Sequence, residues 1–442
     1  MTPKSPVSIL CGPVAALVLL FTGPAAAAPL LLTHVSVIDG TGAPARADMT
    51  IAIDHGRIEA VYPTGSRPAP KDARVENLAG RYVIPGLTDA HVHITEVEPD
   101  PAHYAKFLRA LLLGGVTAIR DMAGDDRLLG YLAWRANSGA IPAPDIFYAA
   151  LMAGPSFFTE DVRAQAASAG ESLGFAPWMR AVTAATDMPL AIAAAKGTGA
   201  TGIKIYANLP ATLVKSITAE AHRQGLRVWT HAAIFPAKPS DAVAAGVDTI
   251  SHSSYLVWEA APHMPGDYRV RAYGDFRHIK PDAPQILALF AAMRARGTIL
   301  DATLRVFKQE AEHRPDAVGA GIMPWSYAVT KLAHERGVPI DAGTDSSGLP
   351  AGKDGPDLNA LPSVHDEMAL LVEHCGFTPL EAIEAATEIS AEAVGQGAER
   401  GTIVPGKLAD LVVLTADPSR DIANTRKIAM VIKNGHIFRR DR

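Results

Sequence analysis

The sequence predicts an α/β protein: a (β/α)₈ barrel of the TIM type with a small β domain built from both chain ends. Two observations lead to this prediction. In the middle of the chain, short apolar runs alternate with helix-like stretches, which is the pattern of parallel βαβ units. Near both ends, β-rich runs are instead separated by turn residues, which is typical of antiparallel sheets. At 442 residues the chain is long enough to bury the cores of both parts.

Residues 1–28 have the layout of a secretory signal peptide. Lys4 is followed by an apolar core and then by an alanine run at residues 25–28. The apolar core is interrupted by a Gly-Pro pair and is short for a membrane span. We therefore expect cleavage, export to the periplasm or the exterior, and no stable membrane association afterwards; an uncleaved N-terminal anchor is the alternative. After cleavage only Cys375 remains, so no intrachain disulfide is expected.

Residues 29–80 and 396–442 are predicted to form the two parts of a small antiparallel β domain. In the first part, β-rich runs are separated by turn residues such as the Asp-Gly pair at 39–40. The second part has the same character and contains an Asn-Gly pair at 434–435, a dipeptide typical of two-residue hairpin turns. We therefore expect the two chain ends to pair into one β domain.

Residues 81–395 are predicted to form the barrel, because they contain eight apolar, strand-like runs. Helix-like segments such as 211–225 and 284–297 lie between most of these runs. Such alternation implies parallel strands joined by helices, and eight such units suggest a (β/α)₈ barrel with insertions. The predicted strands lie within residues 83–94, 116–122, 145–153, 202–207, 227–233, 248–254, 297–304 and 339–347.

The overall composition argues against one class of partner. Hydrophobic residues make up 48% of the chain and charged residues 20%, which is ordinary for a soluble globular protein. The formal net charge of −5 offers no general basic surface. Nucleic acid is therefore not an expected partner.

His91 and His93 raise the first question about function, because they lie at the end of an apolar strand. Residues two apart in a strand point to the same face, so the two imidazoles should lie side by side. Buried polar groups need partners. A divalent metal is one such partner, since histidine is the commonest metal ligand. The alternative is a pair of hydrogen-bonded histidines near a strand end.

Further polar residues stand at the ends of other predicted strands, where the active site of a barrel lies. Lys204 is flanked by isoleucines, although lysine is almost never buried without a partner. Taken singly, His231 and His252 could each be a satisfied core histidine, and Asp345 could cap a turn. Six such groups at equivalent strand ends are hard to explain separately. The candidate metal ligands are His91, His93, Lys204, His231, His252 and Asp345.

The chain resembles members of the amidohydrolase superfamily. The stretches that carry the resemblance are "PGLTDAHVHI", "GIKIY", "THA", "SHSS" and "GTDS", in that order and at barrel-like spacing. The tail, from "TPLEAIEAATEIS" onward, resembles the closing helices and returning strands of the family. The resemblance implies a metal-dependent hydrolase with a split β-sandwich beside the barrel. Within the superfamily, the chain looks like the prolidase, dipeptidase and imidazolonepropionase-like branch.

Lys204 matches the strand-4 lysine of superfamily members with two metals, whose amine is carboxylated by CO₂. The resemblance therefore implies two divalent ions bridged by a carbamate on Lys204. Zinc suits the ligand set, with manganese and cobalt as alternatives. Single-metal deaminases lack this lysine and usually place a Glu shortly after the strand-5 His, whereas "AAIFPAK" follows His231 here, which counts against deamination. By analogy, the more buried ion is held by His91, His93 and Asp345, and the more exposed ion by His231 and His252.

The expected reaction is hydrolysis of an amide bond in a dipeptide or an N-acyl amino acid. A hydroxide bridging the two ions would attack the carbonyl, since a metal can lower the pKa of bound water to about 7. Asp345 would take the proton and later deliver it to the leaving amine. Tyr206 and Tyr255, just beyond the fourth and sixth strands, are candidates for substrate contacts; ordinary packing is the alternative for both.

The long loop after the sixth strand supplies candidates for binding a carboxylate. Arg269, Arg271 and Arg277 lie there and could grip a substrate carboxylate by bidentate pairing. Long loops in compact domains are often binding loops; the alternative is solvated charges on a mobile loop. After the third strand, "MAGPSFFTED" lacks the His that many relatives carry, so another residue would have to serve in its place.

Two other functions stay open at this point. A hydrolase of lactones or cyclic amides would use the same scaffold. A binding protein without catalysis would be expected to have lost ligands, and none of the six is missing. Superfamily members are commonly homo-oligomers, so a homo-oligomer acting on a small molecule or dipeptide is expected.

Overall fold

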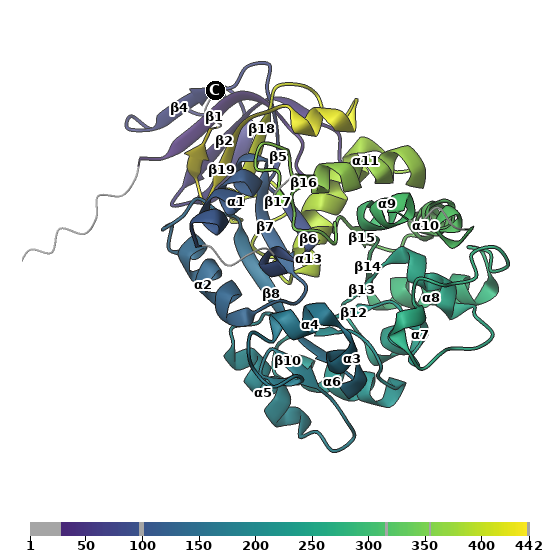
Figure 1. Cartoon of the computed structure of the whole chain (residues 1–442). Coiled ribbons are helices and arrows are strands. Elements are labelled where there is room, and N and C mark those ends of the chain that lie inside the picture. Colours follow the sequence, from purple (N-terminus) through teal and green to yellow (C-terminus); the bar gives the residue numbers. More distant parts are fainter. Residues whose placement is uncertain (1–27, 97–100, 314–316, 353–354, 440–442) are drawn as a thin grey trace, which may run out of the picture.

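The computed structural model describes residues 28–96, 101–313, 317–352 and 355–439 (Figure 1). The predicted signal peptide lies, except for its last residue, outside the described residues and stays a prediction. Within the described part of the chain, no helix combines the length and the apolar character needed to cross a membrane. Two large sheets dominate the fold, one in the barrel and one built from the two chain ends.

A ring of eight parallel strands forms the larger part of the protein, which confirms the predicted barrel. Each strand pairs in parallel with the next. The first and last strands are joined where the backbone N–H of His93 donates to Ser346 and that of Asp345 donates to His91, both at 2.8 Å. The strands are β6 (Leu87–Val92), β7 (Val116–Asp121), β8 (Asp145–Ala153), β11 (Gly202–Ile205), β12 (Arg227–His231), β13 (Thr249–Ser251), β14 (Ile299–Asp301) and β15 (Ile340–Asp341).

Helices surround this ring (Figure 1). Helix α6 (Ala211–Arg223) shows why: Val214, Ile217, Thr218 and Ala221 are buried and recur every three or four positions, so they form one face of the helix. The other helices of the ring are α1 (Pro101–Leu113), α2 (Asp126–Asn137), α5 (Met188–Gly197), α7 (Pro239–Ala245), α8 (Pro284–Arg296), α10 (Ala317–Glu335) and α11 (Val364–Cys375).

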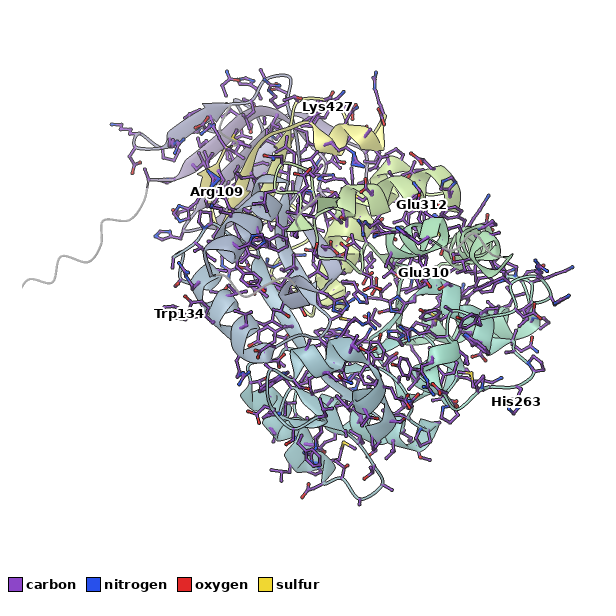
Figure 2. The ribbon with its side chains drawn as sticks, viewed as in Figure 1. Arg109, Trp134, His263, Glu310, Glu312 and Lys427 are labelled. Carbon is purple, nitrogen blue, oxygen red and sulfur yellow. The ribbon has the colours of Figure 1, made fainter. Side chains whose placement is uncertain are left out.

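Short helices inserted after three strands build the rim of the barrel. One of them, α9 (Leu304–His313), carries Glu310 (Figure 2). It is anchored by Glu367 of α11, whose carboxylate accepts hydrogen bonds from the backbone N–H groups of Leu304 at 2.8 Å and Arg305 at 2.7 Å. These insertions are α3 (Pro155–Glu160) and α4 (Val162–Ala167) after β8, η2 (Ser253–Glu259) and η3 (Tyr268–Val270) after β13, and α9 (Leu304–His313) after β14. Two short strands, β9 (Phe175–Ala176) and β10 (Met179–Ala181), extend the sheet beside β8, and α12 (Pro379–Glu384), η4 (Ala385–Ile389) and α13 (Ser390–Ala393) follow α11.

The second sheet combines both chain ends, as predicted. Its strand order is β20-β19-β18-β5-β1-β2-β3, with β4 beside β1. It has its own apolar cluster, in which Leu32 and Ile51 from the N-terminal part meet Val413 and Ile432 from the C-terminal part. Its strands are β1 (Leu30–Val37), β2 (Arg46–Asp54), β3 (Arg57–Pro63), β4 (Arg74–Asn77), β5 (Tyr82–Pro85), β18 (Leu411–Leu414), β19 (Ile428–Lys433) and β20 (His436–Phe438).

Strand β5 corrects the predicted boundary between the two parts. The division at residues 80 and 81 assigned the apolar run before His91 to the barrel, but β5 pairs with β1 and β18. The barrel begins only at Leu87, after Gly86. A Cβ at Gly86 would lie 2.2 Å from the side chain of Thr117, so only glycine fits where the chain passes from one sheet to the other.

A buried ion cluster connects the terminal sheet to the barrel. Asp145, at the start of β8, lies 2.6 Å from Lys433 of β19 and 2.5 Å from Arg400. Arg400 also lies 3.2 Å from Asp410. Burial alone would raise the pKa of Asp145, but the charges of Arg400 and Lys433 outweigh this effect and lower it. The carboxylate is therefore ionised at neutral pH and compensates two buried cations.

Asp145→Asn is expected to destabilise the protein by about 3–5 kcal/mol, because breaking a buried ion pair leaves uncompensated charge in the interior. Urea unfolding at pH 7 measures this free energy. Asp366→Asn is the matched control, since Asp366 of α11 pairs at 2.6 Å with Arg426 near the same boundary but is 47% exposed. Exposed pairs contribute only about 0–1 kcal/mol. Equal losses in the two variants would contradict the assigned role of Asp145.

Candidate metal centre

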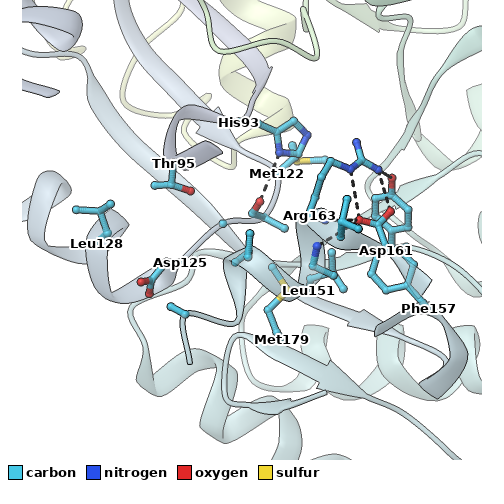
Figure 3. A pocket seen from close by; sticks show the side chains of 18 residues that line it. His93, Thr95, Met122, Asp125, Leu128, Leu151, Phe157, Asp161, Arg163 and Met179 are labelled. Carbon is cyan, nitrogen blue, oxygen red and sulfur yellow. Dashed lines mark hydrogen bonds and ion pairs between the residues drawn. The ribbon is translucent and has the colours of Figure 1, made fainter. Parts of the chain in front are cut away.

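Several cavities adjoin one another at the carboxyl ends of the barrel strands, and two of them concern the predicted site. The smaller, which we call the inner cavity, has a volume of about 120 Å³, and the larger, the side cavity, about 470 Å³ (Figure 3). His93, Arg163 and Tyr206 line both. The inner cavity is lined by all six residues predicted as metal ligands: His91, His93, Lys204, His231, His252 and Asp345.

The parallel register explains how residues distant in sequence meet here. His231 of β12 pairs with Ser251 of β13, and Ser251 pairs with Asp301 of β14. The carboxyl ends of these strands therefore lie at the same height along the barrel. Immediately beyond the strands, His252 has φ 80° and Asp345 has φ 48°. Residues other than glycine seldom adopt this left-handed region. Such backbone strain clusters at functional sites, where the surrounding structure holds it in place.

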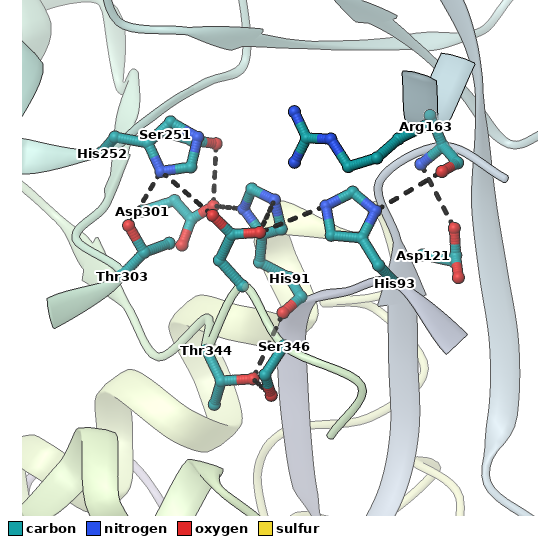
Figure 4. A network of polar contacts seen from close by, with 12 residues as sticks. His91, His93, Asp121, Arg163, Ser251, His252, Asp301, Thr303, Thr344 and Ser346 are labelled. Carbon is teal, nitrogen blue, oxygen red and sulfur yellow. Dashed lines mark hydrogen bonds and ion pairs between the residues drawn. The ribbon is translucent and has the colours of Figure 1, made fainter. Parts of the chain in front are cut away.

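Asp345 contacts three histidines of the polar cluster. Figure 4 shows these three rings, His91, His93 and His252. Oδ1 of Asp345 is 3.4 Å from Nε2 of His91 and 3.2 Å from Nε2 of His93, and its Oδ2 is 3.7 Å from Nδ1 of His252. Ligand atoms of His91, His252 and Asp345 all lie within 4.8 Å of one another. Nε2 of His252 also lies 3.2 Å from Nε2 of His231. The four imidazoles and the Asp345 carboxylate thus surround the inner cavity, where each could act as a metal ligand.

The protonation states of these groups suit metal binding. Burial lowers the pKa of His91 and lowers those of His231 and His252 well below the usual value, so these rings are neutral at pH 7. Burial alone would raise the pKa of Asp345, but His91 and a hydrogen bond with His93 hold it well below the usual range. Neutral imidazoles and an ionised carboxylate are the forms that bind metal ions.

Lys204 is the least conventional member of the cluster. Its side chain is fully buried in β11, and its Nζ has no hydrogen-bond partner among the described residues. Burial lowers the pKa of Lys204 to about 7. Because an isolated ammonium is costly to bury, the Lys204 amine is neutral in a substantial fraction of molecules. Its Nζ is also a buried polar atom without a hydrogen-bond partner among the described residues.

Asp301 is a functional residue that the sequence analysis missed. It ends β14, and its Oδ2 lies 2.6 Å from Nδ1 of His91 and accepts a hydrogen bond from Ser251 Oγ at 2.8 Å. Because a carboxylate requires a donor, Nδ1 of His91 carries the proton and Nε2 faces the cluster as a ligand. Carboxylates of this kind orient metal-binding histidines. The signal was present in the sequence, since Asp301 follows an apolar strand as Asp345 does.

The predicted substrate-binding residues separate into two groups. Tyr206, Tyr255 and Arg271 line the inner cavity. Arg269 does not: its side chain is 59% exposed and pairs with Asp267 and, at 3.5 Å, with Glu160.

Arg277 is also exposed and does not line the inner or the side cavity. For Arg269 and Arg277 the structure therefore favours the alternative of solvated charges. Arg271 differs from them, since it lies over the ring of Tyr268, 5.0 Å from its centroid, and accepts a hydrogen bond from Trp258 at its backbone carbonyl. These contacts hold Arg271 against the cavity.

Arg163 of α4 is a second residue that sequence reasoning missed. Its guanidinium donates to the Tyr206 hydroxyl at 2.9 Å and pairs with Asp161 at 3.1 Å. It comes from the insertion after β8, where the sequence analysis noted a missing histidine. No sequence signal identifies it, because an arginine in a short helix is typical of a surface position.

Comparison with known proteins agrees with this geometry. The model of the Amidohydrolase family matches residues 82–438. Imidazolonepropionase of Chromobacterium violaceum is 26% identical over 398 residues, 85% of each chain. Adenine deaminase 1 of Jannaschia sp. (strain CCS1) is 42% identical over only 69 residues, which are 16% of this chain and 11% of the deaminase.

A solved structure of a Xaa-Pro dipeptidase with bound methionine in its active site shares the fold, with a TM-score of 0.73 at 22% identity, covering 93% of this chain and 100% of the other. The family model spans the barrel and strands β5, β18, β19 and β20 of the terminal sheet, and it includes the positions of all six clustered residues. The chain therefore belongs to the amidohydrolase family.

Proposed function

We propose that this protein is a metal-dependent hydrolase that cleaves the amide bond of a dipeptide or an N-acyl amino acid. Family membership supports a hydrolase that uses divalent metal ions. The observation that carries the finer proposal is Lys204, a fully buried amine without a hydrogen-bond partner, placed among four histidines and Asp345. That arrangement is poorly suited to a structural lysine and well suited to a lysine that has been converted into an anion.

The residues present would hold two metal ions, with a carboxylated Lys204 as a further anionic ligand. The neutral amine of Lys204 would attack CO₂, forming an N–C bond and releasing a proton, and the resulting carbamate would carry negative charge. A pKa of about 7 makes the neutral amine available for this step. His91, His93 and Asp345 would hold one ion, and His231 and His252 the other. Zinc suits these nitrogen and oxygen donors.

The chemistry divides between the metal ions and the chain. Metal ions bound here would supply an activated water and polarise the scissile carbonyl. Asp345 would accept the proton of the attacking water at a carboxylate oxygen and deliver it to the leaving amine. Asp301 would keep Nε2 of His91 aimed at the site through the bond at Nδ1.

Arg271 would recognise the free carboxylate of the substrate. It lines the inner cavity together with Glu310 and Asp345, and none of the ion pairs found among the described residues includes it. Its side chain hydrogen-bonds to Tyr255. A guanidinium held in a cavity without an acidic partner is suited to bidentate binding of an incoming carboxylate.

Amidation of the substrate carboxylate is expected to lower kcat/KM by roughly 10–100-fold, since a hydrogen bond to a charged group contributes about 1.5–3 kcal/mol. Arg271→Gln should lower kcat/KM for the free acid by a similar factor and remove the difference between acid and amide. Arg269→Gln is the control, because Arg269 lies in the same loop but is exposed. Equal rates of the wild type on acid and amide would refute carboxylate recognition.

A panel of metal-loaded assays tests the proposed reaction. It should contain dipeptides, N-acyl amino acids, lactones and cyclic amides. Turnover of the first two classes supports the proposal. Turnover restricted to lactones or cyclic amides would replace it with the alternative reaction on the same scaffold, and the absence of all turnover by a metal-loaded protein would favour a binding role. We also propose export through the signal peptide at residues 1–28, which N-terminal sequencing of the mature protein tests.

A further inference from the structure

The side cavity has a size and a position that the reaction alone does not explain. Its volume of about 470 Å³ falls in the range of small-molecule binding sites. It adjoins the inner cavity, because His93, Arg163 and Tyr206 line both. Figure 3 shows His93 and Arg163 among the residues that line the side cavity. A substrate held with its scissile bond beside His93 could therefore extend one end into the side cavity.

The walls of the side cavity are mostly apolar. Met122 is fully buried, and Leu151, Phe157 and Met179 are 2–3% exposed. Helix α4 closes another side, and its small side chains leave the space open. The alanines that line the cavity are Ala123, Ala164, Ala166, Ala167 and Ala169.

The charged groups at the rim of the side cavity are already paired. Asp125 accepts hydrogen bonds from the backbone N–H of Arg127 at 3.0 Å and from its guanidinium at 3.1 Å. Asp161 pairs with Arg163 at 3.1 Å. Among the described residues lining the cavity, no buried side-chain polar atom lacks a hydrogen-bond partner. The cavity thus offers apolar surface, and its carboxylates are not available for a substrate ammonium group.

We propose that the side cavity binds the apolar acyl group of an N-acyl amino acid, which makes the enzyme selective for long or aromatic acyl groups over acetyl. This inference rests on the proposed amide hydrolysis. Arg271 lines the inner cavity but not the side cavity, so the two ends of such a substrate have separate sites. A dipeptide with a free amino terminus would have to place its ammonium group near apolar walls and paired acids, and is therefore the poorer substrate.

The first test measures kcat/KM for the N-acetyl, N-butanoyl and N-hexanoyl derivatives of one amino acid. Each buried methylene should raise kcat/KM about threefold to fourfold, and the hexanoyl compound should exceed the acetyl compound by at least about 30-fold. Equal values across the series would overturn the proposal.

Variants of α4 locate the effect in the side cavity. Ala167→Leu should lower kcat/KM for the hexanoyl compound by at least about tenfold and change the acetyl compound by less than about twofold. Gln165→Leu adds the same side chain at an exposed position of α4 that does not line the cavity, and should change neither. Leu128→Phe, from the facing helix α2, is a second filling variant if Ala167→Leu folds poorly. Equal losses on both substrates by a folded variant would overturn the proposal.

A binding experiment separates this inference from the proposed reaction. Hexylphosphonate and methylphosphonate share an anionic head, and calorimetry with the metal-loaded protein should find that hexylphosphonate binds at least about 30-fold more tightly. Ala167→Leu should abolish that difference. If the difference is found but no N-acyl amino acid is hydrolysed, the proposed reaction fails and the apolar site stands. If both phosphonates bind equally, the apolar site is rejected whatever the reaction.

Discussion

Lys204→Ala is expected to lower kcat by at least about 10²-fold and to lose much of the bound metal. Lys204 is the one lysine among the described residues that line the inner cavity, so the variant removes the candidate for a bridging carbamate. Loss of an outer partner of a metal ligand already costs roughly 10–100-fold in affinity or activity, and a bridging ligand should cost more. Metal content and kcat measured on the same preparation test this result.

Two additions sharpen the Lys204 experiment. Acetate or propionate should restore part of the activity and part of the metal, because a short carboxylate fits the space left by the removed side chain and can bridge in its place. Lys215→Ala on α6 is the control, since Lys215 is exposed and should be silent. Full activity of Lys204→Ala would exclude the carbamate-bridged centre.

Asp345→Asn is expected to fold normally, to keep at least one metal ion and to lose about 10²–10⁴-fold in kcat. Asparagine keeps the shape and one ligand oxygen but cannot accept a proton, and groups that transfer protons typically contribute this factor. The pKa of Asp345 is held well below its usual range, so the wild-type carboxylate is ionised at neutral pH and ready to accept a proton. The acidic limb of the pH–rate profile should flatten in the variant.

The alternative role of Asp345, as a turn cap, predicts almost no effect, because Asn also caps well. The hydrogen bonds of this turn disagree with that role. The backbone N–H of Gly348 donates to Ser346 Oγ at 3.0 Å, so Ser346 accepts a hydrogen bond within the turn. The Asp345 carboxylate instead faces His91 and His93. Asp187→Asn provides a matched control, since Asp187 is the N-cap of α5 and accepts from Leu190. Turnover near the wild-type level in Asp345→Asn would eliminate Asp345 as the proton carrier.

The sequence predicted the barrel and the six clustered residues because both depend on local patterns. Apolar runs separated by helical segments identify parallel strands, and parallel strands bring their carboxyl ends together. His91, His93 and Asp345 could therefore be placed in one site without any knowledge of distances. The terminal sheet was equally visible, but the pairing of β5 was not, because Gly86 divides one continuous apolar run between two sheets.

Loop residues could not be assigned in the same way. Arg269 lies in the short helix η3 and Arg271 directly follows it. Their different surroundings come from tertiary packing, since Arg271 packs against Tyr268 and Trp258. Arg163 is brought to the site by an insertion whose path depends on tertiary contacts. The side cavity likewise depends on how α4 packs beside β8, and that packing has no periodic signature in the sequence.

Metal content by elemental analysis tests the central claim most directly. The wild-type protein, purified and dialysed against metal-free buffer containing bicarbonate, is predicted to retain about two divalent ions per chain, and Lys204→Ala clearly fewer. One ion per chain in the wild type would contradict the carbamate-bridged pair. No bound metal in a folded protein, even after incubation with zinc, would contradict the metal centre itself.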